Sequence, residues 1–314
     1  MSKASTIAPV TVLMPVYNAE RYLSGALESI LGQTFTDFQF LIIDDGSTDA
    51  SMSILRRYAR HDSRVCIVSR ENRGLVATLN EGLDISRSEF VARMDADDVA
   101  LPHRLEHQVM HMEVHEDIVC LGGYYQLIDR RGRLLTTMTP PTDHEGIEKE
   151  MLAGHTPICH PSAMMRRAAA ARVGGYDPQM MLAEDLDLWL RLGEIGKLAN
   201  LPIPIVRYRL HGNSLSEQAG LKQRRKALEV CERAWERRSI QGAFDASESA
   251  RPLSSRRSRL KFAVLYGWWA FNSGQRSTAL AYGVRSVALA PWNKESIKLM
   301  VCAAIKPLPT LDYL

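Results

Sequence analysis

Short apolar runs and apolar stripes at helical spacing alternate along the first third of the chain. Residues 10–14 are apolar and rich in β-branched side chains, and Pro15 ends the run, which predicts a buried strand. Apolar pairs then recur every four residues over residues 22–31. This spacing predicts a helix with one apolar face, and Asn18 is placed to cap its start.

The same alternation continues as far as residue 115. It predicts further strands at residues 38–43, 65–69 and 90–94, and helices at residues 50–60, 75–83 and 102–115. Because strands alternating with helices indicate βαβ units, we expect an α/β fold with a Rossmann-like, mostly parallel sheet flanked by helices. The pattern beyond predicts a hairpin around residues 119–135, a helix at residues 184–194 and a strand at residues 203–210.

The charge distribution predicts two parts. From Glu217 onward there are 17 Lys and Arg residues against 8 Asp and Glu, whereas the preceding residues hold 22 against 28. We therefore expect an α/β domain over residues 1–216 and a basic α-helical extension over residues 217–314. The extension contains a Ser/Arg-rich linker at residues 247–258 and two helices joined near Pro291 and Trp292. Its charge suits an anionic membrane surface or a phosphorylated acceptor, and a solvated helical face is the alternative.

Composition narrows the class of protein. Apolar residues make up 46% of the 314 residues and charged residues 24%, as in ordinary globular proteins. Five cysteines without close spacing argue against a disulfide framework or a zinc knuckle. A signal-peptide pattern and an apolar run long enough to span a bilayer are both absent from the sequence. We expect a soluble cytoplasmic protein, with peripheral contact at the inner face of the membrane left open.

Two acidic turns follow predicted parallel strands. Residues 44–49 (Asp-Asp-Gly-Ser-Thr-Asp) come after the second strand, and residues 95–98 (Asp-Ala-Asp-Asp) after the fourth. Side chains alternate along extended backbone, so Asp95 and Asp97 project to the same side. Hard divalent cations prefer carboxylate oxygens and can neutralise a diphosphate leaving group. Because ligands of such sheets bind at the carboxyl ends of the strands, we expect the two turns to converge on one site.

Five segments in series resemble family-2 glycosyltransferases. They are Pro15-Val16-Tyr17-Asn18, residues 44–49, Glu71-Asn72-Arg73-Gly74 with Asn80 and Gly82, residues 95–98, and Glu184-Asp185-Leu186-Asp187-Leu188-Trp189. The likeness covers roughly residues 9–215. It implies a GT-A fold, an inverting transfer from a nucleotide-sugar donor, and dependence on Mg²⁺ or Mn²⁺. It also implies a glycan or lipid-linked acceptor, in surface polysaccharide or lipopolysaccharide biosynthesis.

The resemblance implies a nucleotide-sugar site. Pro15 and Tyr17 would line the nucleotide base, and Asp45 would accept a hydrogen bond from a base N–H, which points to uracil and a UDP-sugar. Asn72 and Arg73 would lie beside the base and the phosphates. Two alternatives stay open: Asp45 caps the following helix, and Arg73 is simply solvated.

The resemblance also implies metal ligands and a general base. Asp97 would bind the metal directly, Asp95 would lie near ribose and metal, and His211 would contact the metal or the diphosphate. Inverting transfer needs a base for the acceptor hydroxyl, and Asp185 is our choice, with Glu184 as the alternative or as a residue that orients the acceptor. A structural histidine and acidic residues that complement the helix dipole are the competing interpretations.

Several residues near these segments have no settled role. Trp189 either belongs to the core or stacks on an acceptor sugar, and Asp187 is equally open. His160-Pro161 and Gly174-Gly175-Tyr176-Asp177 resemble family segments that border the acceptor pocket. Residues 140–158 show no feature that predicts their structure.

Competing functions make different demands on the sequence. A sugar-1-phosphate nucleotidyltransferase or a dehydrogenase needs a glycine-rich loop after the first strand, which this chain lacks. A non-catalytic domain that binds a nucleotide sugar or a partner protein would not need both Asp97 and Asp185. The basic extension lacks the interleaved aromatic residues of a single-strand binder, so we expect no nucleic-acid partner.

Overall fold

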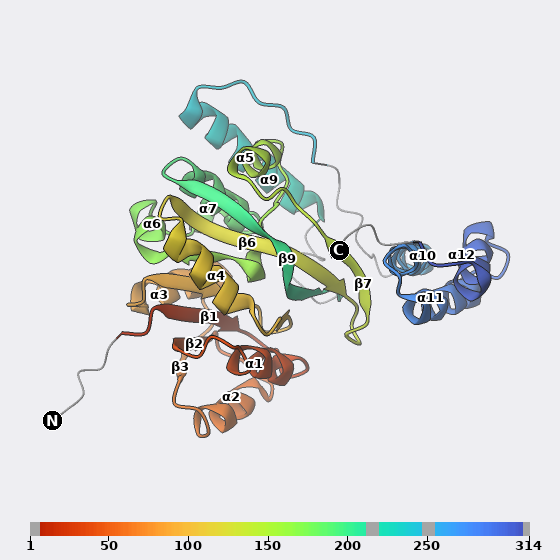
Figure 1. Ribbon diagram of the computed structural model, residues 1–314, viewed down its shortest axis with the longest axis horizontal. Helices are drawn as coiled ribbons and strands as arrows, with labels where there is room; N and C mark the ends of the chain where they lie inside the picture. Colours follow the sequence, from red (N-terminus) through yellow and green to blue (C-terminus); the bar gives the residue numbers. More distant parts are fainter. Residues whose placement is uncertain (1–6, 212–219, 247–254, 310–314) are drawn as a thin grey trace. The chain divides into compact units, whose positions relative to one another are not determined.

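The computed structural model describes residues 7–211, 220–246 and 255–309 (Figure 1). Its internal contacts divide the chain into two units. The first unit comprises Met1–Tyr125, Thr139–Arg207 and Lys222–Ala246, and the second comprises Gln126–Met138, Tyr208–Leu221 and Ser247–Leu314. The predicted domain boundary between residues 216 and 217 lies outside the described residues, as does most of the predicted linker.

A sheet of parallel and antiparallel strands forms the centre of the fold. Its strands are β1 (Val10–Val16), β2 (Phe38–Asp44), β3 (Val65–Ser69), β4 (Phe90–Arg93), β5 (Val99–Ala100), β6 (Ile118–Ile128), β7 (Leu134–Met138), β8 (Met164–Arg166) and β9 (Lys197–Arg209). They follow the order β3-β2-β1-β4-β8-β6-β9-β5, and β7 pairs with β6. Strands β3, β2, β1 and β4 are parallel, as predicted, whereas β8 joins β4 and β6 in antiparallel pairs.

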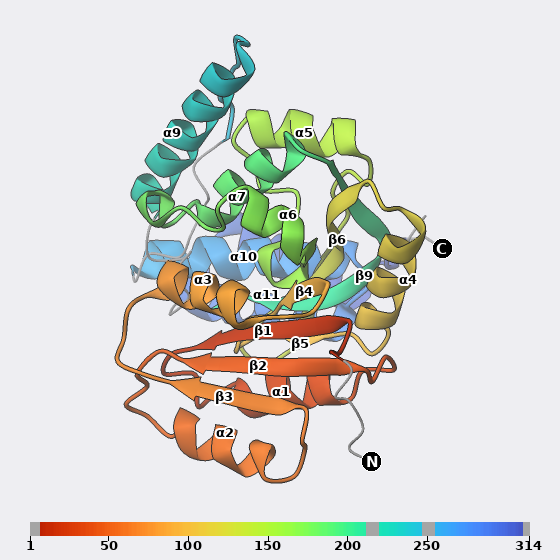
Figure 2. The ribbon, with the colours of Figure 1, turned by 90° about the vertical axis from the view of Figure 1, so that its left-hand side faces the viewer.

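The helices cover both faces of this sheet in the first unit. They are α1 (Leu23–Leu31), α2 (Ser51–Ala59), α3 (Leu75–Ile85), α4 (Arg104–Val114), α5 (His144–Leu152), α6 (Arg167–Arg172), α7 (Glu184–Gly193) and α9 (Gly220–Arg238), with 3₁₀ turns at His160–Ser162 and Pro178–Met180. Figure 2 shows β1, β2 and β3 side by side with their arrowheads at the same edge. The predicted α/β fold is thereby confirmed.

Alternating residues of β1 explain why helices are needed on both faces. Val12 and Met14 belong to a core cluster with Leu27 of α1, whereas Leu13 belongs to another with Leu79 of α3. Central parallel strands buried on both sides read as continuous apolar runs, as residues 10–14 do. Helices packed on both faces of the sheet therefore hold β1 in place.

The start of α1 corrects one prediction. Asn18 does not cap this helix, whose N-cap is Tyr22 without a side-chain hydrogen bond. Asn18 instead adopts a left-handed conformation with φ of 49°, and its Oδ1 accepts a hydrogen bond from the Thr48 amide at 2.8 Å. Asparagine tolerates this backbone region better than most residues. Its side chain thus ties the loop after β1 to the acidic loop after β2.

Helix α5 occupies part of the segment for which the sequence predicted no structure. Asp143 caps it by accepting a hydrogen bond from the Gly146 amide at 2.8 Å, and Ile147 and Met151 are buried one turn apart. The cap and the four-residue spacing are both readable in the sequence. The neighbouring prolines and glycine masked this short helix.

Helix α9 packs onto the first unit, although the sequence places it in the basic extension. Val230 and Ala234 belong to the same core cluster as α7 residues. The indole N–H of Trp235 donates to the Leu152 carbonyl at 3.1 Å, and the Arg238 guanidinium pairs with Glu148. Its arginines therefore serve partly as structural links within this unit.

The second unit contains the end of β6, strand β7 and three helices. The hairpin of β6 and β7 turns at residues 129–133, as predicted, and the helices are α10 (Arg256–Asn272), α11 (Arg276–Leu289) and α12 (Lys294–Ile305). The prediction of two helices was wrong, because the chain also breaks at Gly274, which has φ of 75°. The predicted junction near Pro291 is confirmed between α11 and α12. Among the described helices, none has the length and hydropathy to cross a bilayer.

Candidate active site

Strand β1 lies between β2 and β4, so the loops that follow all three strands leave the same edge of the sheet. Val16 pairs with Asp44 in β2, and Leu13 pairs with Arg93 in β4. Both acidic turns therefore start at the carboxyl edge, one on each side of β1. This arrangement is the one that the sequence predicted for a ligand site.

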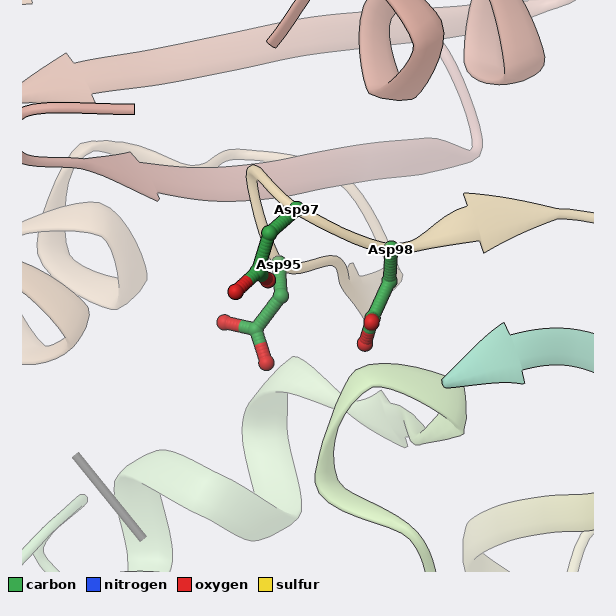
Figure 3. Close-up of side chains that lie close together, drawn as sticks. All are labelled: Asp95, Asp97 and Asp98. Atoms are coloured by element: carbon green, nitrogen blue, oxygen red, sulfur yellow. The ribbon is translucent and has the colours of Figure 1, made fainter. Parts of the chain in front are cut away.

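Three carboxylates gather in the loop between β4 and β5 (Figure 3). Asp95, Asp97 and Asp98 each have an oxygen within 4.8 Å of the others, and Asp98 is buried while the other two are partly buried. Asp95 and Asp97 thus lie together as their alternate spacing predicted. Oxygen-only ligands this close match the preference of Mg²⁺ and similar hard cations, so the donor set fits such an ion.

A buried arginine, Arg93, pairs with this cluster, and the sequence analysis did not single it out. Arg93 is the last residue of β4, its side chain is 3% exposed, and its guanidinium pairs with Asp95. Burial alone would lower its pKa, but Asp95 and Asp98 hold the pKa of Arg93 above its ordinary value. Arg93 is therefore charged and compensates part of the negative charge of the loop.

Helix α4 fixes the backbone from which the cluster extends. The buried Arg104 donates to the Arg93 carbonyl at 2.7 Å, and its Nε donates to Gln108 Oε1 at 3.1 Å. Gln108 in turn donates to the carbonyls of Leu121 at 2.9 Å and Ser162 at 2.8 Å. These bonds join β4, β6 and the segment before β8 at the strand end.

Asp45 is tied to the turn after β3. Its carboxylate accepts hydrogen bonds from the amides of Arg73 at 2.8 Å and Gly74 at 2.9 Å, and it pairs with the guanidinium of Arg70. It does not cap α2, which has Ala50 as its N-cap. A carboxylate has about four acceptor positions, so one remains for a ligand beside the three that the chain occupies.

The other predicted nucleotide contacts surround Asp45. Tyr17 is 54% exposed, and Asn72 and Arg73 are exposed on the turn that Asp45 holds. Pro15, in contrast, is buried within β1 opposite Ile43. The accessible side chains are therefore Tyr17, Asn72 and Arg73, while Pro15 shapes the strand beneath them.

Glu184 and Asp185, the acidic pair at the start of α7, are mostly buried and follow a strained turn. Leu182 has a positive φ of 85°, which is costly for a leucine, and its amide donates to Glu184 Oε2 at 2.7 Å. Asp185 Oδ1 accepts from the Leu186 amide at 2.8 Å. Glu184 is thus positioned by the strained turn, while the second oxygen of the partly buried Asp185 is not used by this bond.

Burial changes the protonation of this pair. Burial, and then the neighbouring Asp185, raise the pKa of Glu184 to about 7, and burial also raises the pKa of Asp185. Arg93 opposes both shifts, and Asp95 reinforces the shift of Asp185. The pair therefore interacts electrostatically with Arg93 and Asp95, although 90 residues separate Asp185 from Asp95 in sequence. A carboxyl group whose pKa lies near 7 suits a site of general acid–base chemistry.

A network of contacts borders the pair on the side of Tyr176. His160 Nε2 and the Tyr176 hydroxyl lie 3.0 Å apart, and Asn80 exchanges two hydrogen bonds of 2.8 Å with the Tyr176 backbone. Burial, and then Arg93, keep the pKa of His160 well below its ordinary value, so this imidazole is neutral. The structure thus joins the two segments that the sequence placed near the acceptor.

Trp189 and Asp187, the two residues of α7 whose roles the sequence left open, both have structural contacts. Trp189 is fully buried and belongs to the core, with its ring edge-on to His160 at 5.9 Å between centroids. Asp187 is also buried, and its carboxylate accepts from Arg191 Nε at 2.9 Å. Arg191 also donates to the carbonyls of Val173 and Gly175. Asp187 therefore orients the arginine that holds the turn before Tyr176.

His211 follows β9 and belongs to the second unit. The cluster of possible metal ligands in the described part of the chain consists of Asp95, Asp97 and Asp98. The role of His211 as a further ligand stays a prediction.

The raised pKa of Glu184 leads to a prediction about stability. Its native pKa of about 7 lies above the ordinary 4.5, so the native state binds more protons than the unfolded chain between these values. The free energy of unfolding therefore falls as the pH rises through this window. We expect Glu184→Gln to be more stable than the wild type at pH 8 by about 1–3 kcal/mol, and to lose most of this pH dependence.

Urea unfolding at pH 5 and pH 8 measures both effects. Glu232→Gln, at an exposed position on α9, is the matched control and should retain the wild-type dependence. Equal pH dependence in the Glu184→Gln variant and the wild type would contradict the assigned shift.

Known proteins are similar to this chain in sequence and in fold. The profile of glycosyl transferase family 2 matches residues 11–174, more than half of the chain. An uncharacterized glycosyltransferase of Haemophilus influenzae is 34% identical over 232 residues, which cover 70% of this chain and 71% of that protein. The O-antigen biosynthesis glycosyltransferase WbnJ of Escherichia coli is 33% identical over 214 residues, covering 67% and 83% of the two chains.

A solved structure extends the likeness to three dimensions. The mannosyltransferase PcManGT of Pyrobaculum calidifontis, in complex with GDP-Man and Mn²⁺, is 20% identical with a TM-score of 0.55, covering 96% of this chain and 81% of that one. At this identity the likeness concerns the fold. Together, the profile, the relatives and the strand order show that the chain belongs to glycosyl transferase family 2 and has the GT-A fold.

Proposed function

We propose that this glycosyltransferase moves a sugar from a nucleoside diphosphate, preferably UDP, to an acceptor hydroxyl with inversion at the anomeric carbon. One observation supports this most: the Asp95–Asp98 loop and the Glu184–Asp185 pair interact electrostatically with each other and with Arg93. The proposed donor site and the proposed base would thereby act together. A domain that only bound a nucleotide sugar would have no use for an acidic pair coupled electrostatically to the cluster.

The donor half of the proposal rests on two loops. Asp45 retains one acceptor position for a base N–H, and the exposed Tyr17 and Asn72 flank it. Asp97 and Asp95 would hold a divalent cation, and when bound this ion would neutralise charge on the diphosphate. The Mn²⁺ in the PcManGT complex supports this part of the proposal.

The acceptor half assigns separate roles to the two acids of α7. Asp185 accepts the proton of the acceptor hydroxyl as that oxygen attacks the anomeric carbon from the face opposite the diphosphate. Glu184 is held by the Leu182 amide, and its raised pKa keeps part of it protonated near neutral pH. A protonated Glu184 can donate a hydrogen bond to the acceptor and leaves Asp185 as the ionised member of the pair.

The names of two relatives support a proposal for the acceptor class. WbnJ is named for O-antigen biosynthesis, and AmsE of Erwinia amylovora, 29% identical over 214 residues, for amylovoran biosynthesis. We propose a glycan or lipid-linked acceptor in surface polysaccharide or lipopolysaccharide synthesis, handled in the cytoplasm.

Donor binding should depend on Asp97. In a thermal-shift screen of common nucleotide sugars with Mn²⁺, we expect one donor to raise the melting temperature of the wild type by about 4 °C near saturation. Asp97→Ala should abolish the part of this rise that requires Mn²⁺, since the ion loses its direct ligand. Asp84→Ala, at an exposed position on α3, is the control. An unchanged Mn²⁺-dependent shift in Asp97→Ala would remove this residue from the metal site.

Transfer should depend on Asp185 without loss of donor binding. Asp185→Asn keeps the side-chain shape and its hydrogen bond to the Leu186 amide, so we expect a normal thermal shift with the donor. General base catalysis contributes roughly 10²–10⁴-fold, and the rate of donor turnover should fall by this factor. Near-normal turnover in Asp185→Asn, with a severe loss in Glu184→Gln, would assign the base to Glu184. Failure of the wild type to hydrolyse or transfer any donor that binds would favour a non-catalytic binding domain.

A further inference from the structure

The described part of the second unit is strongly basic. Residues 126–138, 208–211 and 255–309 contain 13 lysines and arginines against two acidic residues, Asp129 and Glu295. Asp129 is buried and already used, since it accepts hydrogen bonds from Arg133 Nε at 2.7 Å and from the Tyr282 hydroxyl at 2.9 Å. The described part of this unit therefore keeps an excess of 11 positive charges.

Exposed apolar side chains form rows on the last two helices of this unit. Leu280 and Val284 follow one another on α11, and α12 presents Ile297, Val301 and Ile305 at the same four-residue spacing. The helices pack against each other through other positions. A side chain added at Gly283 would place its Cβ 2.9 Å from the Met300 Cα, so the two backbones approach closely there. The exposed apolar rows are thus not the surfaces through which helices α11 and α12 pack against each other.

The turn between these helices presents a tryptophan. Trp292 is 92% exposed, more than any other large apolar side chain in the described part of the chain. Lys294 and Lys298 follow it on exposed positions of α12. Tryptophan prefers the boundary between lipid and water, where its ring is partly buried and its N–H stays solvated.

The positive charge and the exposed apolar side chains of this unit together indicate which kind of partner it would bind. A second copy of the unit would bring two positive surfaces together, which is unfavourable. A soluble polyanion matches the charge but leaves the apolar rows and Trp292 without a role. A bilayer with anionic headgroups satisfies both, because peripheral helices bind by apolar burial and by attraction of basic residues to acidic lipids.

We propose that the α11–α12 hairpin is a membrane-docking surface for anionic lipid, with Trp292 entering the interface and Lys294 and Lys298 facing the headgroups. Attachment is peripheral, in keeping with the lack of a spanning helix among those described. Docking of this hairpin does not depend on the sugar donor. It would hold the enzyme at the surface where a lipid-linked acceptor lies.

Co-sedimentation of the full chain with vesicles tests the proposal. The vesicles contain either phosphatidylcholine alone or phosphatidylcholine with 30% phosphatidylglycerol, about the anionic content that attracts basic segments. We expect pelleting with the anionic vesicles only, weakening as salt is raised. Lys294→Gln/Lys298→Gln should lower the partition coefficient roughly 30-fold, since each lysine near an anionic surface contributes about fivefold. Trp292→Ala should lower it as well, and the intrinsic fluorescence change on binding should shrink.

Matched substitutions in the first unit control for general effects. Arg56→Gln/Arg60→Gln removes two exposed basic residues at the same spacing on and after α2, and Val114→Ala removes an exposed apolar side chain from α4. Neither control should change the partition coefficient. Circular dichroism of each variant separates a loss of binding from a loss of folding.

Three results would overturn the proposal. One is equal pelleting of the wild type and the Lys294→Gln/Lys298→Gln variant. Another is binding to soluble polyphosphate as strong as to anionic vesicles and indifferent to Trp292→Ala, which would identify a soluble polyanion as the partner. The third is a dimer in sedimentation velocity that dissociates in Trp292→Ala, which would make the hairpin a self-association surface.

Discussion

Arg93 is buried at the end of β4, and its guanidinium pairs with Asp95 beside Asp98. A buried charge without a counter-ion costs several kcal/mol, so this arginine is stable only because the acidic loop surrounds it. The loop depends on Arg93 in return, since three carboxylates within 4.8 Å of one another repel. Arg104 donates a hydrogen bond to the Arg93 carbonyl. The positive charge of the Arg93 guanidinium lowers the pKa of both Glu184 and Asp185, against the effect of burial. Arg93 therefore interacts electrostatically with both the Asp95–Asp98 loop and the acidic pair of α7.

Much of this fold follows from periodicity. The strand Val65–Ser69 has the predicted bounds. Strands β1, β2 and β4 lie within two residues of theirs, because strands buried on both faces must be continuous apolar runs. The adjacency of Asp95 and Asp97 follows from side-chain alternation alone. Parallel pairing of β1 with β2 and β4 then brings both acidic turns to one edge, which topology requires once the strands are known.

Other parts of the site depend on contacts that no local pattern encodes. Arg93 and Arg70 read as ordinary polar residues at strand ends, and only tertiary packing shows that one compensates the Asp95–Asp98 loop and the other holds Asp45. The positive φ of Leu182 is equally invisible, because leucine has no preference for that conformation. Asn18 failed as a helix cap because the loop after β2 offered its side chain a competing donor in Thr48. Antiparallel β8, a three-residue strand, is too short for any period to reveal.

We propose that one site at the carboxyl edge holds a divalent ion and a nucleoside diphosphate beside the acidic pair of α7. Anomalous diffraction from crystals grown with Mn²⁺ and UDP measures this directly. We expect a single strong manganese peak within roughly 2.3 Å of an Asp97 carboxylate oxygen, with the diphosphate between the ion and Asp185. A manganese peak held by other residues, or a nucleotide bound away from this edge, would contradict it.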